Sequence, residues 1–188
     1  MRIFMTDRGR QPDWRGIIRN LRRGDHVIIR DYDHPNRASL AQAIIAVCKQ
    51  HGVSYAIGGD MRLAWRLKAG VHLTERDLRR GPICLWSGRH HSAAIHQAHD
   101  LKKASDMGAN LALISPVFAT RSHPNARVLG RVKYHHLAQQ ARRFGLSPVA
   151  LGGMTRYSAR ALFGVEQPRA KIAAIDGIAD LCRLYFCP

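Results

Sequence analysis

Short apolar segments that alternate with helical ones place the strongest constraint on how this chain can fold. Eight short stretches are rich in apolar residues, and each is bounded by Gly, Pro or polar turn residues. Runs of this kind predict short buried strands. The predicted strands are residues 1–7 (ending in a polar turn), 26–30, 54–57, 70–73, 82–87, 110–114, 148–151 and 171–175.

Helical periodicity fills most of the intervals between these strands. The predicted helices are residues 12–23, 39–50, 62–67, 92–107, 132–144, 155–163 and 178–186, with little helix between the fourth and fifth strands. Strands joined through helices run parallel, because each return crossover needs a helix. The α/β pattern therefore favours a single (β/α)8 TIM barrel. A doubly wound open sheet is the alternative, since periodicity cannot count sheet edges. No linker or shift in composition divides the chain, so residues 1–188 are expected to form one domain.

The chain is strongly basic, with 30 Lys and Arg against 13 Asp and Glu and a formal net charge of +17. Such a field attracts polyanions. The basic residues are spread over several predicted helices, however, and no basic motif interleaved with aromatic residues accompanies them. This distribution favours phosphorylated small-molecule substrates over a dedicated nucleic-acid function. The same distribution is also compatible with a homo-oligomer.

Cysteine usage and hydropathy suggest a cytoplasmic protein with no membrane partner. No apolar run approaches the length of a membrane span, and the chain does not open with a secretory signal pattern. The four cysteines form no CxxC pair, and their spacing from the histidines does not match a zinc site. We expect them to be reduced: Cys48, Cys84, Cys182 and Cys187.

The stretch 113–124 passes from an apolar strand into a polar loop. In a parallel barrel, the loops at the carboxyl ends of the strands build the active site. Thr120 and Ser122 offer hydroxyl donors, and Arg121 and His123 offer positive charge, so the loop suits an anion. An ordinary strand-to-helix connection explains the same residues.

Paired glycines follow the seventh predicted strand. Gly152 and Gly153 would let the backbone approach a ligand closely, and a helix begins next at Thr155. The loops after strands seven and eight of a barrel often bind phosphate. A tight turn is the alternative explanation.

Carboxylates follow the fourth predicted strand. Glu75 and Asp77 lie just beyond it, where they would suit Mg²⁺ that retains water and substrate phosphate as its other ligands. His72 alternates with apolar neighbours in this strand, as a residue that faces the barrel interior would. We favour a structural histidine there over a catalytic one.

Taken together, these motifs resemble those of thiamine phosphate synthase and its TenI-like relatives. They are GVHLxxxD at 70–77, Ser87, PVFxTxS at 116–122 and ALGGMT at 150–155. They occur in the family's order and span nearly the whole chain. The resemblance implies a (β/α)8 barrel and a transferase of thiamine biosynthesis. Such an enzyme joins hydroxymethylpyrimidine pyrophosphate to thiazole phosphate and releases pyrophosphate with the help of Mg²⁺.

The resemblance assigns catalytic positions around the pyrophosphate. Arg30 matches the Arg of the family's Gln-x-Arg-x-Lys pattern, in which Ile28 and Tyr32 here replace Gln and Lys. Ser87 matches a Ser at the end of a strand near the pyrophosphate. The remaining positions lie in the loop after the sixth strand, where two hydroxyls match the family's Thr pair and His replaces its Lys: Thr120, Ser122 and His123.

The metal ligands depart from the family pattern. Asp77 matches one Mg²⁺ carboxylate of the family. The family's Asn-Asp after the third strand reads Gly58-Gly59 here, which removes the other expected carboxylate. Asp60 could take its place only if the loop shifts.

The second phosphate would be held by the loops after strands seven and eight. Gly152 and Gly153 match the family's glycines, and Asp176 stands where the family has a Ser, followed by Gly177. A carboxylate facing a phosphate costs roughly 1 kcal/mol or more, and Asp176 could instead cap the last helix.

The positions that depart from the family pattern lie in loops, and the predicted strands are intact. They motivate the alternative of a non-catalytic or altered-activity TenI-like barrel that binds a phosphorylated thiamine-related metabolite. TenI-like tautomerases use a His where this chain has Pro116, so the tautomerase hypothesis loses its main residue.

Overall fold

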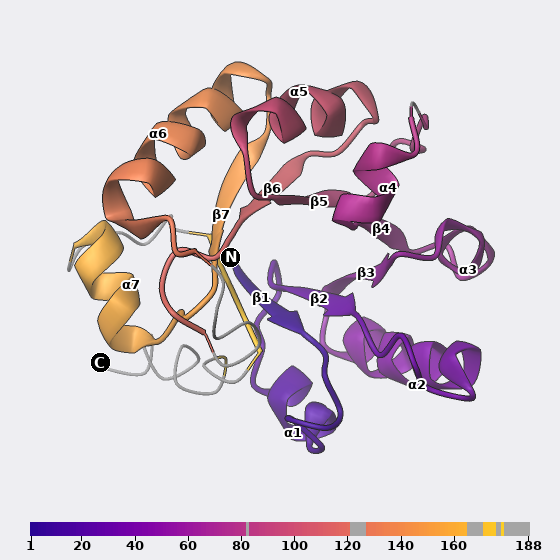
Figure 1. Ribbon diagram of the computed structural model, residues 1–188. Helices are drawn as coiled ribbons and strands as arrows, with labels where there is room; N and C mark the ends of the chain where they lie inside the picture. Colours follow the sequence, from indigo (N-terminus) through magenta and orange to yellow (C-terminus); the bar gives the residue numbers. More distant parts are fainter. Residues whose placement is uncertain (82, 121–126, 165–170, 176–177, 179–188) are drawn as a thin grey trace.

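The strands form a closed barrel in a computed structural model that describes residues 1–81, 83–120, 127–164, 171–175 and 178. All neighbouring strands are parallel and follow the chain order, as Figure 1 shows. Arg2 pairs with Ile172, so the first and last strands close the ring and the open-sheet alternative is wrong. The strands are β1 (Arg2–Met5), β2 (His26–Ile29), β3 (Ser54–Gly58), β4 (Gly70–Leu73), β5 (Ser92–Ile95), β6 (Leu111–Ile114), β7 (Ser147–Leu151) and β8 (Ile172–Ala174).

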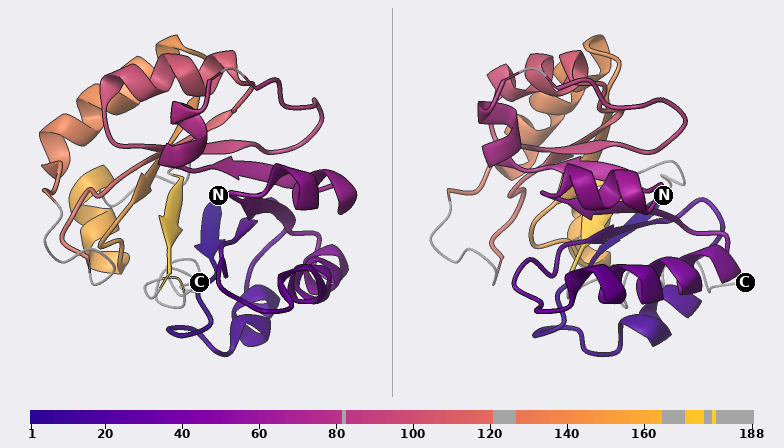
Figure 2. Two further views of the ribbon diagram at one scale, coloured as in Figure 1. Left: turned by 45° about the vertical axis from the view of Figure 1, so that its right-hand side comes forward. Right: turned by 90° about the vertical axis from the view of Figure 1, so that its right-hand side faces the viewer.

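Helices lie around the outside of this ring, as the views in Figures 1 and 2 show. They are α1 (Trp14–Arg19), α2 (Arg37–Gln50), α3 (Met61–Arg66), α4 (Glu75–Arg79), α5 (Ala98–Asp106), α6 (Gly130–Arg143) and α7 (Arg156–Phe163). The final helix expected over 178–186 lies outside the described residues apart from Ile178. No helix in the described part of the chain has the length and apolarity needed to cross a bilayer.

The predicted fifth strand is wrong. The apolar run from Ile83 to Trp86 is a loop, and β5 lies further along the chain at Ser92–Ile95. The loop is apolar because it packs against the barrel: Leu85 is buried, and its backbone N–H donates to the carbonyl oxygen of Met107 at 3.1 Å. The true strand is small and rich in Ala, which made it look like the first turns of the following helix.

The apolar core has two layers, set by the alternation of side chains along each strand. One layer fills the barrel interior: Ile3, Met5, Ile28, Ala56, Leu111, Leu113, Val149, Ala173 and Ile175. The other lies between the strands and the surrounding helices and includes Phe4, Ile44, Leu101 and Leu162. Full burial of one Leu or Ile side chain stabilises a fold by about 1.5–3 kcal/mol. The packed barrel therefore holds the loops at the ends of its strands in fixed positions.

The barrel wall also holds two buried His–Ser pairs, each joining neighbouring strands in register. His26 Nδ1 lies 2.8 Å from Ser54 Oγ, and His72 Nδ1 lies 2.9 Å from Ser92 Oγ. Burial lowers the pKa of His26 to about 3 and that of His72 to about 4. Both imidazoles are therefore neutral at pH 7, and His72 has the structural contact expected of an inward-facing barrel residue.

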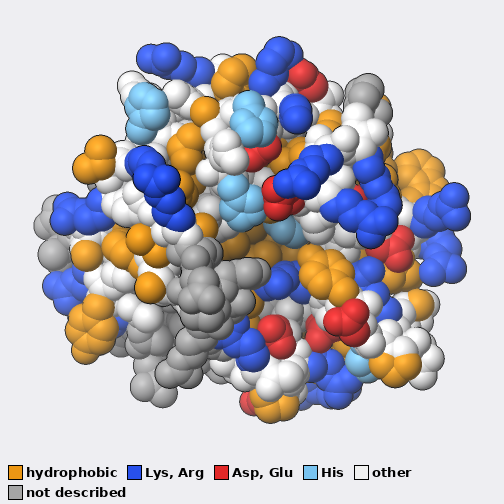
Figure 3. Space-filling model, in the orientation of Figure 1, with side chains coloured by type: hydrophobic (Ala, Val, Ile, Leu, Met, Phe, Trp, Pro, Cys, Tyr) orange, Lys and Arg blue, Asp and Glu red, His pale blue; other side chains and the backbone are white. Residues whose placement is uncertain are grey.

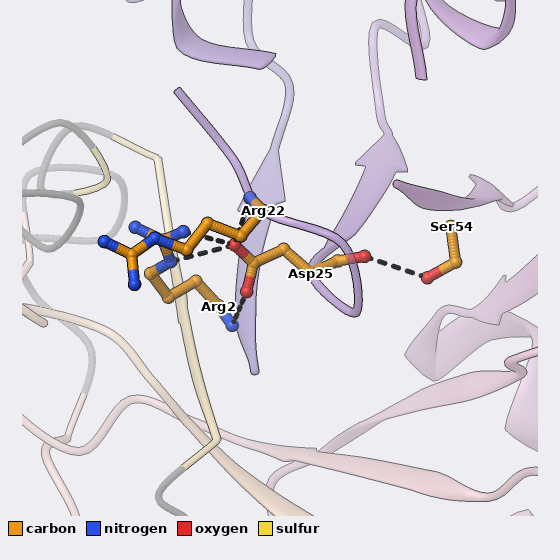
Figure 4. Close-up of polar contacts among 4 residues, drawn as sticks. All are labelled: Arg2, Arg22, Asp25 and Ser54. Carbon is orange, nitrogen blue, oxygen red and sulfur yellow. Dashed lines mark hydrogen bonds and ion pairs between the residues drawn. The ribbon is translucent and has the colours of Figure 1, made fainter. Parts of the chain in front are cut away.

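A buried ion pair ties β1 to the turn that precedes β2, as Figure 4 shows. Asp25 Oδ2 accepts from Arg2 Nε at 2.9 Å and from Arg2 Nη2 at 2.5 Å. The backbone N–H groups of Arg2 and Arg22 also donate to this carboxylate, at 2.8 and 2.9 Å. The carbonyl oxygen of Asp25 accepts from the Ser54 hydroxyl at 3.0 Å. These bonds fix the amino end of the barrel.

Candidate functional site

The carboxyl ends of the strands form one rim, because all eight strands are parallel. Several polar or loop-forming residues stand at the point where a strand ends. Arg30 follows β2, Gly58 ends β3, Thr74 follows β4, Ser115 follows β6 and Gly152 follows β7. Side-chain and backbone hydrogen bonds join these strand ends from one loop to the next.

The connection between the ends of β1 and β2 fixes the backbone of Arg30. The Thr6 hydroxyl oxygen accepts from the Arg30 N–H at 2.9 Å and donates to Asp31 Oδ2 at 2.5 Å. The Arg30 guanidinium carbon lies 5.9 Å from the centre of the Tyr32 ring. The Arg30 charge also acts on His72, whose pKa is lowered first by burial and then by Arg30. Arg30 is therefore a positioned cation at the rim.

Tyr32 packs against the turn that ends β3. A Cβ built on Gly58 would lie 3.0 Å from Tyr32 Oη, and one built on Gly59 would lie 3.3 Å from Tyr32 Cε1. Gly59 also has a φ of +63°, which L side chains rarely adopt. The tyrosine ring thus occupies the space beside the two positions where the resemblance expected Asn and Asp.

Arg37 reaches the same turn from the first turn of α2. Its Nη2 donates to the carbonyl oxygen of Gly58 at 2.5 Å, and its Nη1 lies 3.6 Å from Asp60 Oδ2. Its guanidinium carbon lies 5.3 Å from the centre of the Tyr32 ring. The sequence reasoning missed this residue. Its contact with Gly58 joins residues 21 positions apart, so the sequence carried no local signal for it.

Both acidic residues predicted to bind a metal are helix caps. Asp77 is 4% exposed, and its Oδ2 accepts from the Thr74 N–H at 2.8 Å and the Thr74 hydroxyl at 2.7 Å. Asp60 Oδ1 accepts from the Leu63 N–H at 2.9 Å, while Oδ2 faces Arg37. Among the described residues, no three His, Cys, Asp or Glu side chains gather closely enough to hold a metal ion. Mg²⁺ requires nearly octahedral oxygen ligands, and these two engaged carboxylates do not fit that requirement.

His96, not Ser87, stands where the fifth strand ends. Ser87 is exposed in a bend before β5, on the side of the barrel where strands begin, so the prediction that it ends this strand is wrong. His96 directly follows β5, and its Nδ1–H donates to the carbonyl oxygen of Ser115 at 2.8 Å. The misplaced fifth strand hid His96, since a correct boundary would have put a histidine at the rim.

The loops after β6 and β7 are joined through their backbones. The Val117 N–H donates to the carbonyl oxygen of Leu151 at 2.9 Å, and the Phe118 N–H donates to that of Gly152 at 3.1 Å. Thr120 follows in the same loop and is partly buried. The two loops therefore form one continuous segment of the rim.

This close approach explains the paired glycines. Gly152 has a φ of +94°, and a Cβ there would lie 2.8 Å from Pro116 Cα. Gly153 has a φ of +61°, and a Cβ there would lie 2.4 Å from the carbonyl oxygen of Ala119. Both positions need glycine for backbone packing. A phosphate-binding role for them stays a prediction.

Four predicted site residues lie outside the described residues: Ser122, His123, Asp176 and Gly177. The described candidates at the rim are Arg30, Asp60, Asp77, Thr120, Gly152 and Gly153, to which the structure adds Arg37 and His96. Figure 3 shows Lys and Arg side chains scattered over the viewed face instead of gathered in one stripe. On this face, selectivity for an anion would come from the local placement of single side chains.

Comparison with known proteins gives consistent matches. A family model described as thiamine monophosphate synthase matches residues 9–178. A thiamine-phosphate synthase of Thiobacillus denitrificans is 29% identical over 160 residues, which cover 83% of this chain and 71% of that protein. One of Anoxybacillus flavithermus is 26% identical over 149 residues, which cover 78% of this chain and 67% of that protein.

A solved structure has the same fold. A thiamine phosphate pyrophosphorylase from Pyrococcus furiosus superposes with a TM-score of 0.74 at 19% identity, covering 97% of this chain and 90% of that one. The fold agrees with the ring seen here, and the family model spans most of the chain. The chain therefore belongs to the thiamine monophosphate synthase family.

Proposed function

We propose that this protein joins hydroxymethylpyrimidine pyrophosphate to thiazole phosphate and releases pyrophosphate, as a step of thiamine biosynthesis. The observation that carries the proposal is that Arg30 stands at the end of β2 on the same rim as the joined loops after β6 and β7. Membership of the family supports the same choice of substrates.

Departure of pyrophosphate sets the main physical demand on the site. The bond between the pyrimidine methylene carbon and the pyrophosphate oxygen breaks, and the thiazole nitrogen forms a new bond to that carbon. Negative charge accumulates on the leaving oxygen, so cations held in place before reaction lower the barrier. Arg30 meets this demand, because Thr6 holds its backbone and its guanidinium is permanently charged. His72, whose pKa burial and the Arg30 charge lower to about 4, is neutral at pH 7 and adds no charge of its own.

Gly152 and Gly153 would hold the phosphate of the thiazole substrate, and Thr120 would face the pyrophosphate. The backbone hydrogen bond from Phe118 to Gly152 joins the loops that carry these residues, so both lie in one part of the rim. Hydroxyl donors suit phosphate oxygens. This arrangement would place the two phosphorylated substrates side by side across the barrel mouth, a geometry that favours direct transfer.

An assay with both substrates tests the proposal. Wild-type protein should form thiamine phosphate and pyrophosphate in equal amounts, and Arg30→Met should lower kcat by about a hundredfold or more, as loss of one charge-stabilising group does. Arg143→Met, at the exposed end of α6, serves as the matched control and should leave the rate unchanged. Absence of product from wild-type protein at high concentration would reject the synthase activity.

Binding without turnover is the second candidate function. It is favoured by the use of Asp60 and Asp77 as helix caps and by the packing of Tyr32 on Gly58 and Gly59. In that case calorimetry should detect thiazole phosphate or thiamine phosphate binding to a protein that forms no product. Product formation at a rate proportional to enzyme concentration would exclude it.

A further inference from the structure

Arg37 is a mostly buried cation with incomplete compensation. Its side chain is 15% exposed, and the Asp60 carboxylate opposite it is 40% exposed and 3.6 Å away. A buried charge is costly unless it is paired and fully hydrogen-bonded. Because the Asp60 carboxylate is partly solvated and lies 3.6 Å away, it compensates the charge of the Arg37 guanidinium only in part.

The hydrogen bonds of this guanidinium are also incomplete. Nη2 donates to the Gly58 carbonyl oxygen, but Nε is buried and has no hydrogen-bond partner among the described residues. Buried donors in native proteins are nearly always paired. An anion bound beside Arg37 would supply an acceptor for the Nε hydrogen bond that is missing here.

Two guanidiniums lie near the same aromatic ring. The guanidinium carbon of Arg30 lies 5.9 Å and that of Arg37 lies 5.3 Å from the centre of the Tyr32 ring. Two like charges beside one ring raise the local potential, and a multivalent anion that contacts both guanidiniums relieves the repulsion. Planar guanidiniums suit phosphate oxygens because each can donate two parallel hydrogen bonds.

The start of α2 adds to this field. Its N-cap residue, Asn36, makes no side-chain capping bond, and its first turn contains no acidic residue. By contrast, α3 and α4 are capped by Asp60 and by the Thr74–Asp77 capping box. The helix that carries Arg37 thus presents its positive end without a side-chain cap and without an acidic residue in its own first turn.

We propose that Arg37 and Arg30 bind the pyrophosphate group of the substrate directly, so that this site takes pyrophosphate without a divalent cation. This inference rests on the proposed function for the identity of the substrate. Asp60 then orients Arg37 and caps α3, and Asp77 caps α4, in place of serving as metal ligands. The family's Gln-x-Arg-x-Lys pattern has a lysine at the position of Tyr32. Arg37, at the start of α2, supplies a positive charge in place of that lysine.

Calorimetric titration of the full chain with inorganic pyrophosphate tests this inference. With a chelator present, wild-type protein should bind pyrophosphate, and added Mg²⁺ should not strengthen binding beyond its effect on free pyrophosphate. Arg37→Gln should weaken binding about tenfold or more, as expected for loss of a charged hydrogen-bonding group. Arg143→Gln removes the same charge far from the rim and should bind like wild type. Wild-type binding that requires Mg²⁺ would overturn the inference.

Asp60→Asn gives a test in which the two accounts predict opposite signs. Asn caps a helix as well as Asp does, so α3 should stay intact. If Asp60 only orients Arg37, loss of its charge frees the guanidinium, and pyrophosphate binding without metal should strengthen by severalfold. If Asp60 holds a metal, the same variant weakens binding in Mg²⁺, and that result would overturn the inference. Thermal melts confirm folding, and Arg37→Lys, which keeps the charge but not the planar fork, should be intermediate in affinity.

The outcomes separate this inference from the proposed function. Metal-independent pyrophosphate binding that depends on Arg37, in a protein that forms no product, supports the inference and rejects the synthase. Product formation that requires Mg²⁺ and is unaffected by Arg37→Gln supports the synthase and rejects the inference.

Discussion

The guanidinium of Arg37 lies 3.6 Å from the carboxylate of Asp60, and the same carboxylate caps α3 through Leu63. One acidic side chain therefore orients a cation and caps the beginning of a helix at the rim. In a chain with a net charge of +17, scarce carboxylates carry such structural roles. This relationship links the fold of the β2–β4 loops to the charge that a phosphorylated ligand would meet.

The buried pair between Arg2 and Asp25 should be a major contributor to stability. Arg2→Met removes the guanidinium that is paired with the buried Asp25 carboxylate, so the free energy of unfolding should fall by about 3 kcal/mol. Urea denaturation followed by circular dichroism measures the change. Arg79→Met breaks the exposed pair with Glu75 and should cost less than about 1 kcal/mol. Equal losses in the two variants would contradict the assigned role of the buried pair.

Acid should destabilise the barrel through its buried histidines. The folded-state pKa values of His26 and His72, about 3 and about 4, lie below the ordinary value of 6.5. The unfolded chain therefore binds protons first as pH falls. The stability contributed by the neutral imidazoles is present above about pH 6.5 and is lost progressively below it. At about pH 5 the loss should be about 2 kcal/mol for each histidine.

Urea midpoints measured between about pH 7.5 and pH 5 check this expectation. His72→Gln removes one of the buried titrating histidines, so its stability should fall less steeply with acid than that of wild type. A variant with an unchanged slope would show that His72 is not a source of the acid sensitivity.

Gly153 should tolerate a side chain far less well than a glycine of similar backbone conformation in open space. In Gly153→Ala the new Cβ meets the Ala119 carbonyl oxygen at 2.4 Å, so the loops after β6 and β7 must separate. Gly145→Ala, at φ +73° with nothing within 4 Å, is the control and should cost about 1 kcal/mol. Gly153→Ala should cost about 2 kcal/mol more, measured by urea unfolding. Equal costs would mean that the loops are not packed as described.

An aspartate at position 59 should not create a magnesium site. Gly59→Asp places a side chain at φ +63° with its Cβ 3.3 Å from the Tyr32 ring. The free energy of unfolding should fall by more than in Gly24→Asp, where φ is +90° and nothing lies within 4 Å; the control should lose about 1 kcal/mol. Calorimetry with Mg²⁺ should detect no new binding. Tight Mg²⁺ binding by Gly59→Asp would contradict this prediction and would show that the Tyr32 ring moves away to make room for the new carboxylate.

The parallel barrel was predictable because strand and helix periods alternate clearly in most of the chain. Gly70–Leu73 is bounded by turn residues, and its four buried residues form β4 as expected. Ser92–Ile95 was missed because small residues carry little strand signal, while the apolar loop near Leu85 resembled a buried strand. Packing of a loop on the core cannot be distinguished from strand burial by composition alone.

The position of a candidate residue at the rim was predictable where the strand before it was predicted correctly. Arg30 directly follows β2 and Asp77 lies in the helix after β4, and the roles of both in a site stay predictions. Ser87 failed together with the strand that it was expected to end. The capping role of Asp77 was not anticipated, although Thr-x-x-Asp at a helix start is the pattern of a capping box. Arg37 was missed because its contact with Gly58 joins residues 21 positions apart, which no local pattern reveals.

A crystal structure of the full chain with pyrophosphate, grown in the presence of a chelator, tests the central claim most directly. The account predicts pyrophosphate at the carboxyl rim, with its oxygens within hydrogen-bond distance of the Arg30 and Arg37 guanidiniums beside Tyr32. Pyrophosphate bound elsewhere on the basic surface, or bound at the rim only when Mg²⁺ bridges it to Asp60 or Asp77, would contradict the account.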